Sequence, residues 1–229
     1  PGVGGRGGGG IRMGARMGGG GTPTSTVEGG DNRGSLNHEV IPDRIEAGTG
    51  RAAAASTRGN VLIRCARLEH LDSVVLKLTA AGVEVRRAGD GIRVQHHGEL
   101  HSVDIRTAPF PGFPTDMQAQ MMALMTVATG RSVVRETIFE NRFMHVQELR
   151  RMGAKISVEG NSAFITGVDR LLGAAVMATD LRASASLLIA ALAAKGRSAV
   201  LRVYHIDRGY ARIVDKLRSL GAAIERDSA

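Results

Sequence analysis

The sequence of 229 residues contains one cysteine, no tryptophan and only 3% aromatic residues. A single cysteine excludes a disulfide within the chain, which fits a reducing compartment without proving one. No apolar run reaches the roughly 18 residues of a membrane-spanning helix, and no secretory signal is predicted at the start. These absences favour a cytoplasmic protein whose core is built from Ala, Val, Leu, Ile and Met.

Basic residues outnumber acidic ones and give a formal net charge of +8. Such an excess indicates an anionic partner, which could be nucleic acid, a membrane surface or a phosphorylated metabolite. Composition does not choose among these three. With 43% hydrophobic residues, the chain is long enough for one or two domains with a substantial core.

Residues 1–21 hold 12 of the 31 glycines. Because glycine-rich chains lose much backbone entropy and bury little on folding, residues 1–25 are predicted to be disordered. Three arginines lie among these glycines, so the segment could bind RNA through charge. It has no aromatic residue for base stacking, and an extension without function is the alternative that we favour.

Three later segments resemble one another in sequence. Each predicts a helix, then a glycine at its C-terminal end, then a strand of alternating apolar residues. The glycines are 71 and 68 residues apart: Gly82, Gly153 and Gly221. A period of about 70 residues predicts an internal repeat.

The upstream halves of these units also match. An aspartate opens each Ala-rich helix, at Asp43, Asp116 and Asp180, and a β-branched strand follows each helix. We expect α/β units of strand, helix, strand, helix, strand, strand at about 26–100, 101–167 and 168–229. The third unit ends before its last strand, so a closed domain would need that strand from elsewhere.

Equivalent positions in three such units lie around a pseudo-threefold axis, so the helix starts and the following loops are expected at one end. That end would carry Asp116 together with Arg142, Arg182 and Arg208. Helix N-termini and arginines suit a phosphorylated or carboxylated ligand. Locally, Thr115 and Gln118 fit a capping box that would place Asp116 in the first helical turn. Structural ion pairs are the alternative role for these arginines.

Five segments resemble UDP-N-acetylglucosamine 1-carboxyvinyltransferase, the enolpyruvyl transferase of peptidoglycan synthesis. The resemblance runs from about residue 26 to the C-terminus and leaves out the glycine-rich start. It rests on residues 42–49, 107–120, 137–146, 177–185 and 204–210, including Thr115-Asp116-Met117-Gln118, Glu140-Asn141-Arg142-Phe143-Met144-His145 and His205-Ile206-Asp207-Arg208-Gly209-Tyr210.

The resemblance implies a fold and a reaction. The fold is an inside-out α/β barrel of three units with central helices, here from the C-terminal portion only. The reaction transfers the enolpyruvyl group of phosphoenolpyruvate to the 3-hydroxyl of UDP-N-acetylglucosamine and releases phosphate. No cofactor or metal is implied. A sister enzyme that acts on shikimate 3-phosphate shares the repeats but not these motifs.

The resemblance also implies roles for five residues. Asp116 matches the aspartate that contacts the sugar hydroxyl and is the candidate base. Ile138 matches a position whose backbone contacts the UDP-sugar. Arg142 and Arg208 match arginines at the phosphoenolpyruvate end, and Arg182 matches one lining the same cleft. For the other matching acidic residues a structural role is at least as expected: Asp43, Glu46 and Asp180.

The chain departs from the family in three ways. The general-acid cysteine and the lysine and arginine of the substrate clamp have no counterpart, and Cys65 is predicted to be a small buried residue of a strand at 61–65. Gly50 and Arg51 replace large apolar residues and should weaken the first helix. An inactive fragment, a split enzyme completed by a separate N-terminal half and a degenerate copy are therefore alternatives.

Overall fold

The computed structural model describes residues 10–19, 22, 24–29 and 34–227. The chain divides into two units, residues 1–42 and 43–229. No helix among the described residues is long and apolar enough to span a bilayer.

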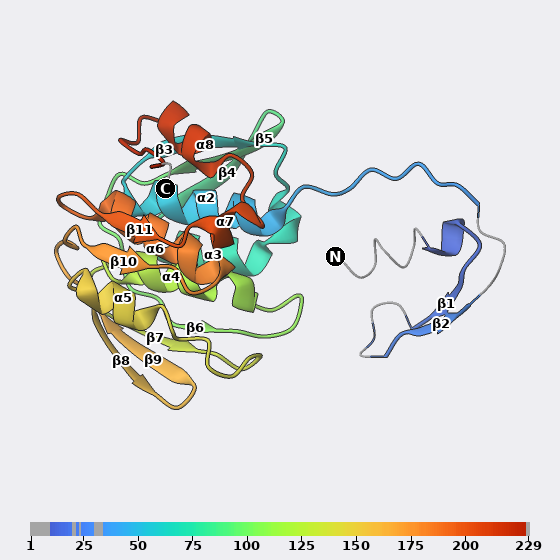
Figure 1. Cartoon of the computed structure of the whole chain (residues 1–229), viewed down its shortest axis with the longest axis horizontal. Helices are drawn as coiled ribbons and strands as arrows, with labels where there is room; N and C mark the ends of the chain where they lie inside the picture. The colour runs from blue at the N-terminus through green and yellow to red at the C-terminus, as the bar shows by residue number, and fades with distance from the viewer. Residues whose placement is uncertain (1–9, 20–21, 23, 30–33, 228–229) are drawn as a thin grey trace. The chain divides into compact units, whose positions relative to one another are not determined.

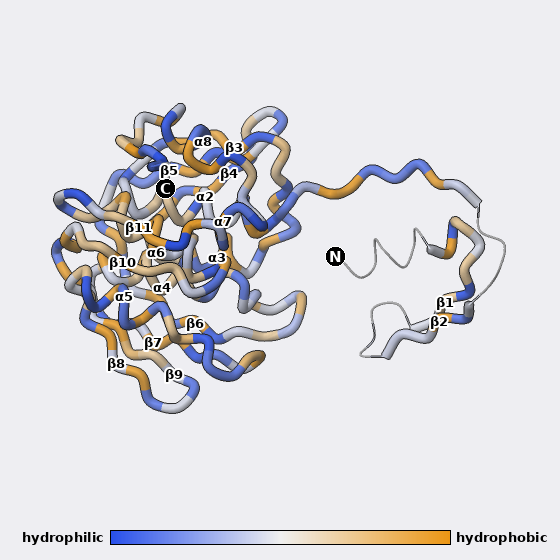
Figure 2. The backbone as a smooth tube through the Cα atoms, viewed as in Figure 1, coloured by the Kyte–Doolittle hydropathy of each residue, from blue (hydrophilic) through white to orange (hydrophobic). Residues whose placement is uncertain are grey.

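Three central helices form the middle of the second unit (Figure 1): α2 (Arg44–Ser56), α4 (Gln118–Met125) and α6 (Leu181–Ala193). All eight residues of α4 are buried, which explains its lack of a charged face. The apolar run predicted at 183–194 forms most of α6, and hydrophobic colours run along it in Figure 2. Small residues let these helices approach closely, as at Gly48, where an added Cβ would lie 2.6 Å from Met117 Sδ.

Three separate sheets surround the central helices (Figure 1). The first has the order β3-β5-β4, the second β6-β7-β9-β8, and the third is the parallel pair β10-β11. The strands of the first are β3 (Asn60–Arg64), β4 (Glu84–Ala88) and β5 (Gly91–Gln95). Those of the others are β6 (Ile105–Arg106), β7 (Arg131–Arg135), β8 (Lys155–Glu159), β9 (Ser162–Thr166), β10 (Ala175–Met177) and β11 (Ala199–Leu201).

Each of the three repeat units also carries an outer helix after its middle strand: α3 (Asp72–Ala80), α5 (Val146–Arg151) and α8 (Ile213–Ser219). Short helical turns precede them, namely η1 (Leu68–His70) and α7 (Tyr204–Asp207). The predicted order of elements is found in full at β6 to β9 and from α2 onward in the repeat before it, whereas the strand expected after Gly221 is absent from residues 222–227. The helix openings at Asp43 and Asp180 are confirmed. The chain thus has the mixed α/β content that the repeat predicts.

The third unit is open on one side. In the first two units an antiparallel hairpin pairs with β3 and β7, whereas β11 pairs only with β10. Residues 222–227, where a closing strand is expected, contain no strand. The described strands therefore form separate sheets and no closed barrel.

The N-terminal unit, residues 1–42, contains a fourth copy of the helix end found in the three repeats. Gly14 has φ +93°, and the three predicted repeat glycines have φ between +91° and +94°. Each glycine N–H donates three residues back, and the next N–H donates five residues back, as in a Schellman motif. The five-residue bonds measure 2.9–3.1 Å: Ala15 to Gly10, Val83 to Leu78, Ala154 to Leu149 and Ala222 to Leu217. Residues 10–15 therefore end a helix as the other units do.

Two strands follow this motif, as in the first two repeat units. β1 (Arg16–Gly18) pairs antiparallel with β2 (Thr26–Glu28), just as β4 pairs with β5 and β8 with β9. The prediction of disorder at residues 1–25 is wrong for residues 10–19, which have local structure. Residues 1–9, 20–21 and 23 lie outside the described residues. The domain boundary expected near residue 25 lies instead between Pro42 and Asp43.

One side chain differs from its predicted environment, and another is a charged residue in the core. Cys65 is exposed and lies one residue beyond β3 with φ +53°, so the prediction of a buried strand residue is wrong. The left-handed backbone there ends the strand, because few side chains continue a strand from that conformation. Arg51, which stands where large apolar residues are expected, is completely buried in α2.

Candidate functional site

Asp116 lies in the short helix η2 (Thr115–Met117), which follows Pro114 and runs into α4. The predicted capping box is wrong, because η2 has no side-chain cap and Thr115 Oγ1 donates to Glu136 Oε2 at 2.8 Å. Gln118 is buried and donates to Met122 Sδ. The Asp116 carboxylate is therefore not required to hold the helix start and remains 39% exposed.

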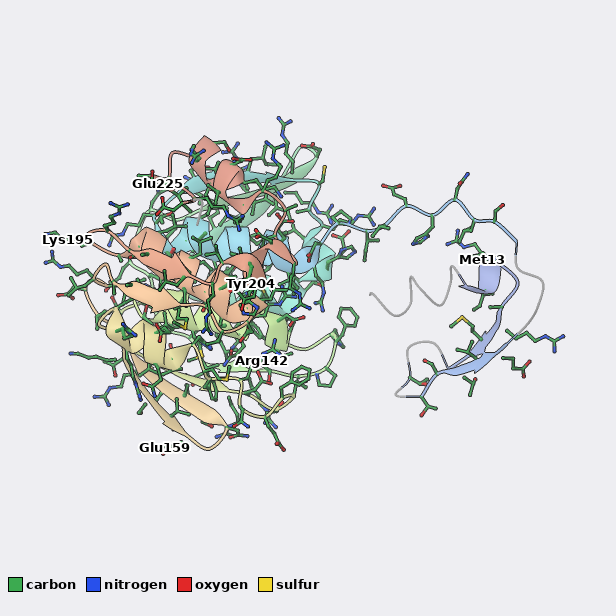
Figure 3. All side chains as sticks on the ribbon, viewed as in Figure 1. Met13, Arg142, Glu159, Lys195, Tyr204 and Glu225 are labelled. Carbon is green, nitrogen blue, oxygen red and sulfur yellow. The ribbon has the colours of Figure 1, made fainter. Side chains whose placement is uncertain are left out.

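Two arginines from two other segments converge on Asp116. Arg142 Nη2 lies 3.1 Å and Arg182 Nε 3.2 Å from the same oxygen, Oδ1. Arg142, labelled in Figure 3, comes from the loop after β7, whereas Arg182 comes from the first turn of α6. Among the described residues nothing hydrogen-bonds Oδ2. One carboxylate oxygen thus anchors two cations while the other stays available.

The Arg182 side chain is 17% exposed. Burial alone would lower its pKa, but the Asp116 charge and hydrogen bond, together with Tyr210, outweigh burial and raise the pKa above its ordinary value. Arg142 is 25% exposed and stacks at 5.0 Å from the centroid of the Phe139 ring. Both cations are thus partly desolvated, which strengthens their attraction for an anion.

The three aspartates at equivalent repeat positions have different hydrogen-bond and ion-pair partners. Asp43 accepts hydrogen bonds from Ile45 N and Glu46 N, and Asp180 accepts them from Arg182 N and Ala183 N. These two carboxylates are N-caps, so the structural alternative is confirmed for them. Asp116 caps nothing and faces arginines instead. Only this member of the set combines exposure with cationic partners.

Glu136 is a buried glutamate whose hydrogen bonds hold the segments around Asp116, and the sequence analysis did not select it. Its carboxylate accepts hydrogen bonds from both Thr107 and Thr115 hydroxyls at 2.8 Å. It also accepts Ile138 N at 2.8 Å and Phe139 N at 3.2 Å. Because the N–H of Ile138 is taken, its carbonyl is the backbone group left for the ligand contact that the resemblance implies.

Arg208, the remaining predicted site arginine, makes no ion pair with Asp116 among the described residues. It ends α7 with an exposed side chain, and the described residues include no ion pair that it makes. Nearby, the hydroxyl of Tyr210 accepts a hydrogen bond from Arg182 Nη1 at 3.4 Å. The structure therefore brings together Asp116, Arg142 and Arg182, and the role of Arg208 stays a prediction.

His145, three residues after Arg142, is buried. Burial lowers its pKa to about 4, with a smaller raising effect of Asp180 and a lowering effect of Arg142. Its Nε2 has no hydrogen-bond partner among the described residues, which fits a neutral imidazole.

Stability should therefore fall in mild acid. Because the folded pKa of His145 is about 4 and the unfolded value 6.5, the unfolded chain binds more protons between these pH values. The free energy of unfolding should drop by about 3 kcal/mol as the pH falls from 6.5 to 4. Urea titrations across this range should show that His145→Gln flattens the slope, while exposed His97→Gln leaves it unchanged. An unchanged slope in His145→Gln would show that other groups cause the loss.

The arrangement suits a ligand that carries both an anion and a hydroxyl group. The arginines can neutralise phosphate or carboxylate oxygens, and a carboxylate with one open oxygen can accept a hydroxyl proton. Within the described residues no group of three His, Cys, Asp or Glu side chains could hold a metal ion. A polar cavity of about 240 Å³ lies elsewhere, between the 66–69 loop and the β4–β5 turn.

Sequence comparison now identifies the family. The model of the family described as EPSP synthase (3-phosphoshikimate 1-carboxyvinyltransferase) matches residues 11–217. The chain belongs to this family. The match starts within the glycine-rich segment, so the family resemblance begins earlier than residue 26 and includes the fourth repeat end.

Relatives within the family agree with the resemblance found in the motifs. UDP-N-acetylglucosamine 1-carboxyvinyltransferase 1 of Caldanaerobacter subterraneus subsp. tengcongensis is 57% identical over 215 residues, covering 94% of this chain and 52% of that protein. The enzyme of the same name from Geotalea daltonii is 56% identical over 216 residues, with coverages of 94% and 52%. The chain thus spans about half the length of these relatives.

Solved structures of the family share the fold. The crystal structure of the enolpyruvyl transferase NikO from Streptomyces tendae superposes with a TM-score of 0.81 at 28% identity, covering 96% of this chain and 53% of that one. EPSP synthase from Acinetobacter baumannii gives a TM-score of 0.70 at 17% identity, covering 95% and 54%. At that lower identity the likeness concerns the fold alone.

Proposed function

We propose that this chain supplies the C-terminal half of the site of a UDP-N-acetylglucosamine 1-carboxyvinyltransferase, the first committed enzyme of peptidoglycan synthesis. The sugar O3 forms a bond to C2 of phosphoenolpyruvate, and the bond from C2 to the phosphate oxygen then breaks to release inorganic phosphate. A proton added to C3 in the first step is lost in the second. The names of the relatives support this reaction.

The position of Asp116 carries the proposal. Of the three equivalent aspartates, Asp43 and Asp180 cap helices, whereas Asp116 presents a carboxylate beside Arg142 and Arg182. In the proposed reaction its open oxygen accepts the proton of the sugar hydroxyl. The arginines, joined by Arg208 when ligand binds, neutralise the phosphate and carboxylate of phosphoenolpyruvate.

The rest of the site is proposed to lie outside this chain. Cys65 is exposed and follows β3 in the first repeat unit. We do not propose it as the general acid. In the whole protein the three units would form an inside-out α/β barrel, with a strand from elsewhere pairing with β11. A separate N-terminal half is the proposed partner, and the chain alone is proposed to be inactive.

Phosphate release tests the proposal directly. The chain is mixed with phosphoenolpyruvate and UDP-N-acetylglucosamine, alone and with the remaining half of the Caldanaerobacter relative supplied as a separate polypeptide. We expect no turnover from the chain alone and turnover in the mixture. A steady rate from the chain alone would contradict the proposed inactivity.

Ligand binding gives a second readout that does not need turnover. Saturation-transfer NMR should detect UDP-N-acetylglucosamine on the chain alone, and Arg142→Gln should weaken the signal. Arg151→Gln is the matched control, because Arg151 lies on the nearby α5 with a side chain that is 61% exposed. Absence of both binding and complementation would overturn the proposed function.

A further inference from the structure

Tyr210 lies where the three central helices meet, although it belongs to the loop after α7. Its ring packs in an apolar cluster with Ala185 and Ile206, and the residue is 1% exposed. The loop is held tightly against α6, because a Cβ added at Gly209 would lie 2.9 Å from Leu181 Cδ2. Only the hydroxyl of Tyr210 leaves the apolar cluster.

That hydroxyl contacts one polar side chain from each central helix. It lies 2.9 Å from Thr49 Oγ1 of α2, 3.3 Å from Gln120 Nε2 of α4 and 3.4 Å from Arg182 Nη1 of α6. Thr49 and Gln120 are buried, and Gln120 Nε2 also donates to Thr49 Oγ1 at 3.2 Å. We call Thr49, Gln120 and Tyr210 the three-helix network.

Two of these bonds have a fixed direction, because arginine and the glutamine NH₂ only donate and the Tyr210 oxygen therefore accepts from both. The two hydrogens of Gln120 Nε2 are shared among Tyr210, Thr49 and the backbone of Asp116. In the bond between Thr49 and Tyr210 either hydroxyl can be the donor. Gln120 is oriented in turn by a 2.8 Å bond from Nε2 to the carbonyl oxygen of Asp116.

The network reaches Asp116 from two sides. Gln120 donates a hydrogen bond to the backbone carbonyl of Asp116. Arg182 binds the Asp116 carboxylate through Nε at 3.2 Å, and it binds the Tyr210 hydroxyl through its other nitrogen Nη1. A guanidinium is planar, so two partners on different nitrogens set its orientation. Without Tyr210, Arg182 would keep one anchor and could rotate about it.

We propose that Tyr210 is a positioning residue, whose hydroxyl holds the Arg182 guanidinium in the orientation that binds Asp116 and links all three units at the site. Its effect on turnover rests on the proposed function, whereas its effect on Arg182 does not. The site is therefore set by the packing of all three units.

Side-chain NMR of Arg182 in the full chain tests the proposal without substrate. We expect Tyr210→Phe to speed hydrogen exchange at Arg182 Nε by about tenfold, because one hydrogen bond to a charged group is lost. The Arg182 signal is assigned by its absence in Arg182→Lys. The backbone N–H of Ala183, bound to Asp180, serves as the internal reference.

Matched variants separate positioning from stability. Tyr204→Phe removes the same hydroxyl from the other tyrosine, which is 58% exposed and labelled in Figure 3, and should change nothing. Thr49→Val removes the hydroxyl that shares a hydrogen bond with Tyr210 and should give a smaller increase in exchange, while Thr49→Ser should retain the slow rate. If Tyr210→Phe does not fold, the two Thr49 variants decide.

Two outcomes would overturn the positioning role. One is unchanged Arg182 exchange, and the other is equal acceleration at Arg182 and Ala183, which indicates local unfolding. In the complemented enzyme, Tyr210→Phe should lower kcat by about tenfold with little change in KM for UDP-N-acetylglucosamine. If Tyr210→Phe alters exchange at Arg182 Nε but the chain binds no substrate, the proposed function is wrong and the positioning role of Tyr210 still holds.

Discussion

Replacing Arg51 with leucine is expected to raise the free energy of unfolding by about 3 kcal/mol. The Arg51 side chain is completely buried in α2, and none of its three guanidinium nitrogens has a hydrogen-bond partner among the described residues. Burial lowers its pKa from the ordinary arginine value to about 10. A tenfold change in proton affinity corresponds to about 1.4 kcal/mol, so burying the charge is costly.

The pH dependence gives this prediction a second test. Because the folded pKa of Arg51, about 10, lies below the unfolded value, the unfolded chain binds more protons from about pH 10 upward, as far as the ordinary pKa of arginine. The penalty from the buried Arg51 charge should therefore decrease only in that range. Below pH 9 the side chain is charged in both states, so the gain from Arg51→Leu should be constant from pH 6 to 9.

Control variants guard against other causes. Arg51→Met keeps an unbranched stem and should stabilise as well, whereas exposed Arg64→Leu at the end of β3 should change stability by less than about 0.5 kcal/mol. The measurement is urea unfolding followed by circular dichroism. If Arg51→Leu lowers stability, a counter-ion must occupy the core beside Arg51, and the desolvation argument fails.

Local patterns were enough to predict the repeat units. Apolar alternation and one glycine at each helix end located the strand pairs after Gly82 and Gly153, because these signals lie within ten residues of each other. Gly14 carries the same motif, and Met13-Gly14-Ala15-Arg16 matches Met152-Gly153-Ala154-Lys155 closely. It was missed because the surrounding glycines suggested disorder, although its backbone matches the other three glycines.

The failed predictions involve partners distant in sequence. Thr115 fits a capping box locally, but the Glu136 carboxylate, 21 residues away, takes its hydroxyl. The bond between Thr49 and Tyr210 joins residues 161 positions apart. No periodicity encodes such a pair, so the three-helix network required the packed structure. The repeat predicted Asp116 beside Arg142 and Arg182, and the structure shows both ion pairs. Its role as a base stays a prediction.

Asp116→Asn should abolish nearly all turnover in the complemented enzyme. A positioned general base contributes about 10²- to 10⁴-fold, and asparagine cannot take the proton of the sugar hydroxyl. We therefore expect kcat for phosphate release to fall by about three orders of magnitude. Asp72→Asn is the matched control, since Asp72 is an exposed first-turn aspartate of the outer helix α3 and should retain full activity.

The same substitution also removes the shared partner of Arg142 and Arg182, and this effect must be separated from catalysis. Because the Asp116 side chain is 39% exposed, solvent screening should limit the stability loss to about 1 kcal/mol. A base acts in the chemical step, so kcat should fall far more than KM for UDP-N-acetylglucosamine rises. If Asp116 only held the arginines in place, KM would rise, kcat would stay within about tenfold, and Asp116→Glu would restore binding. A retained kcat would therefore assign Asp116 to the ion-pair cluster and leave the base to be found in the other half of the site.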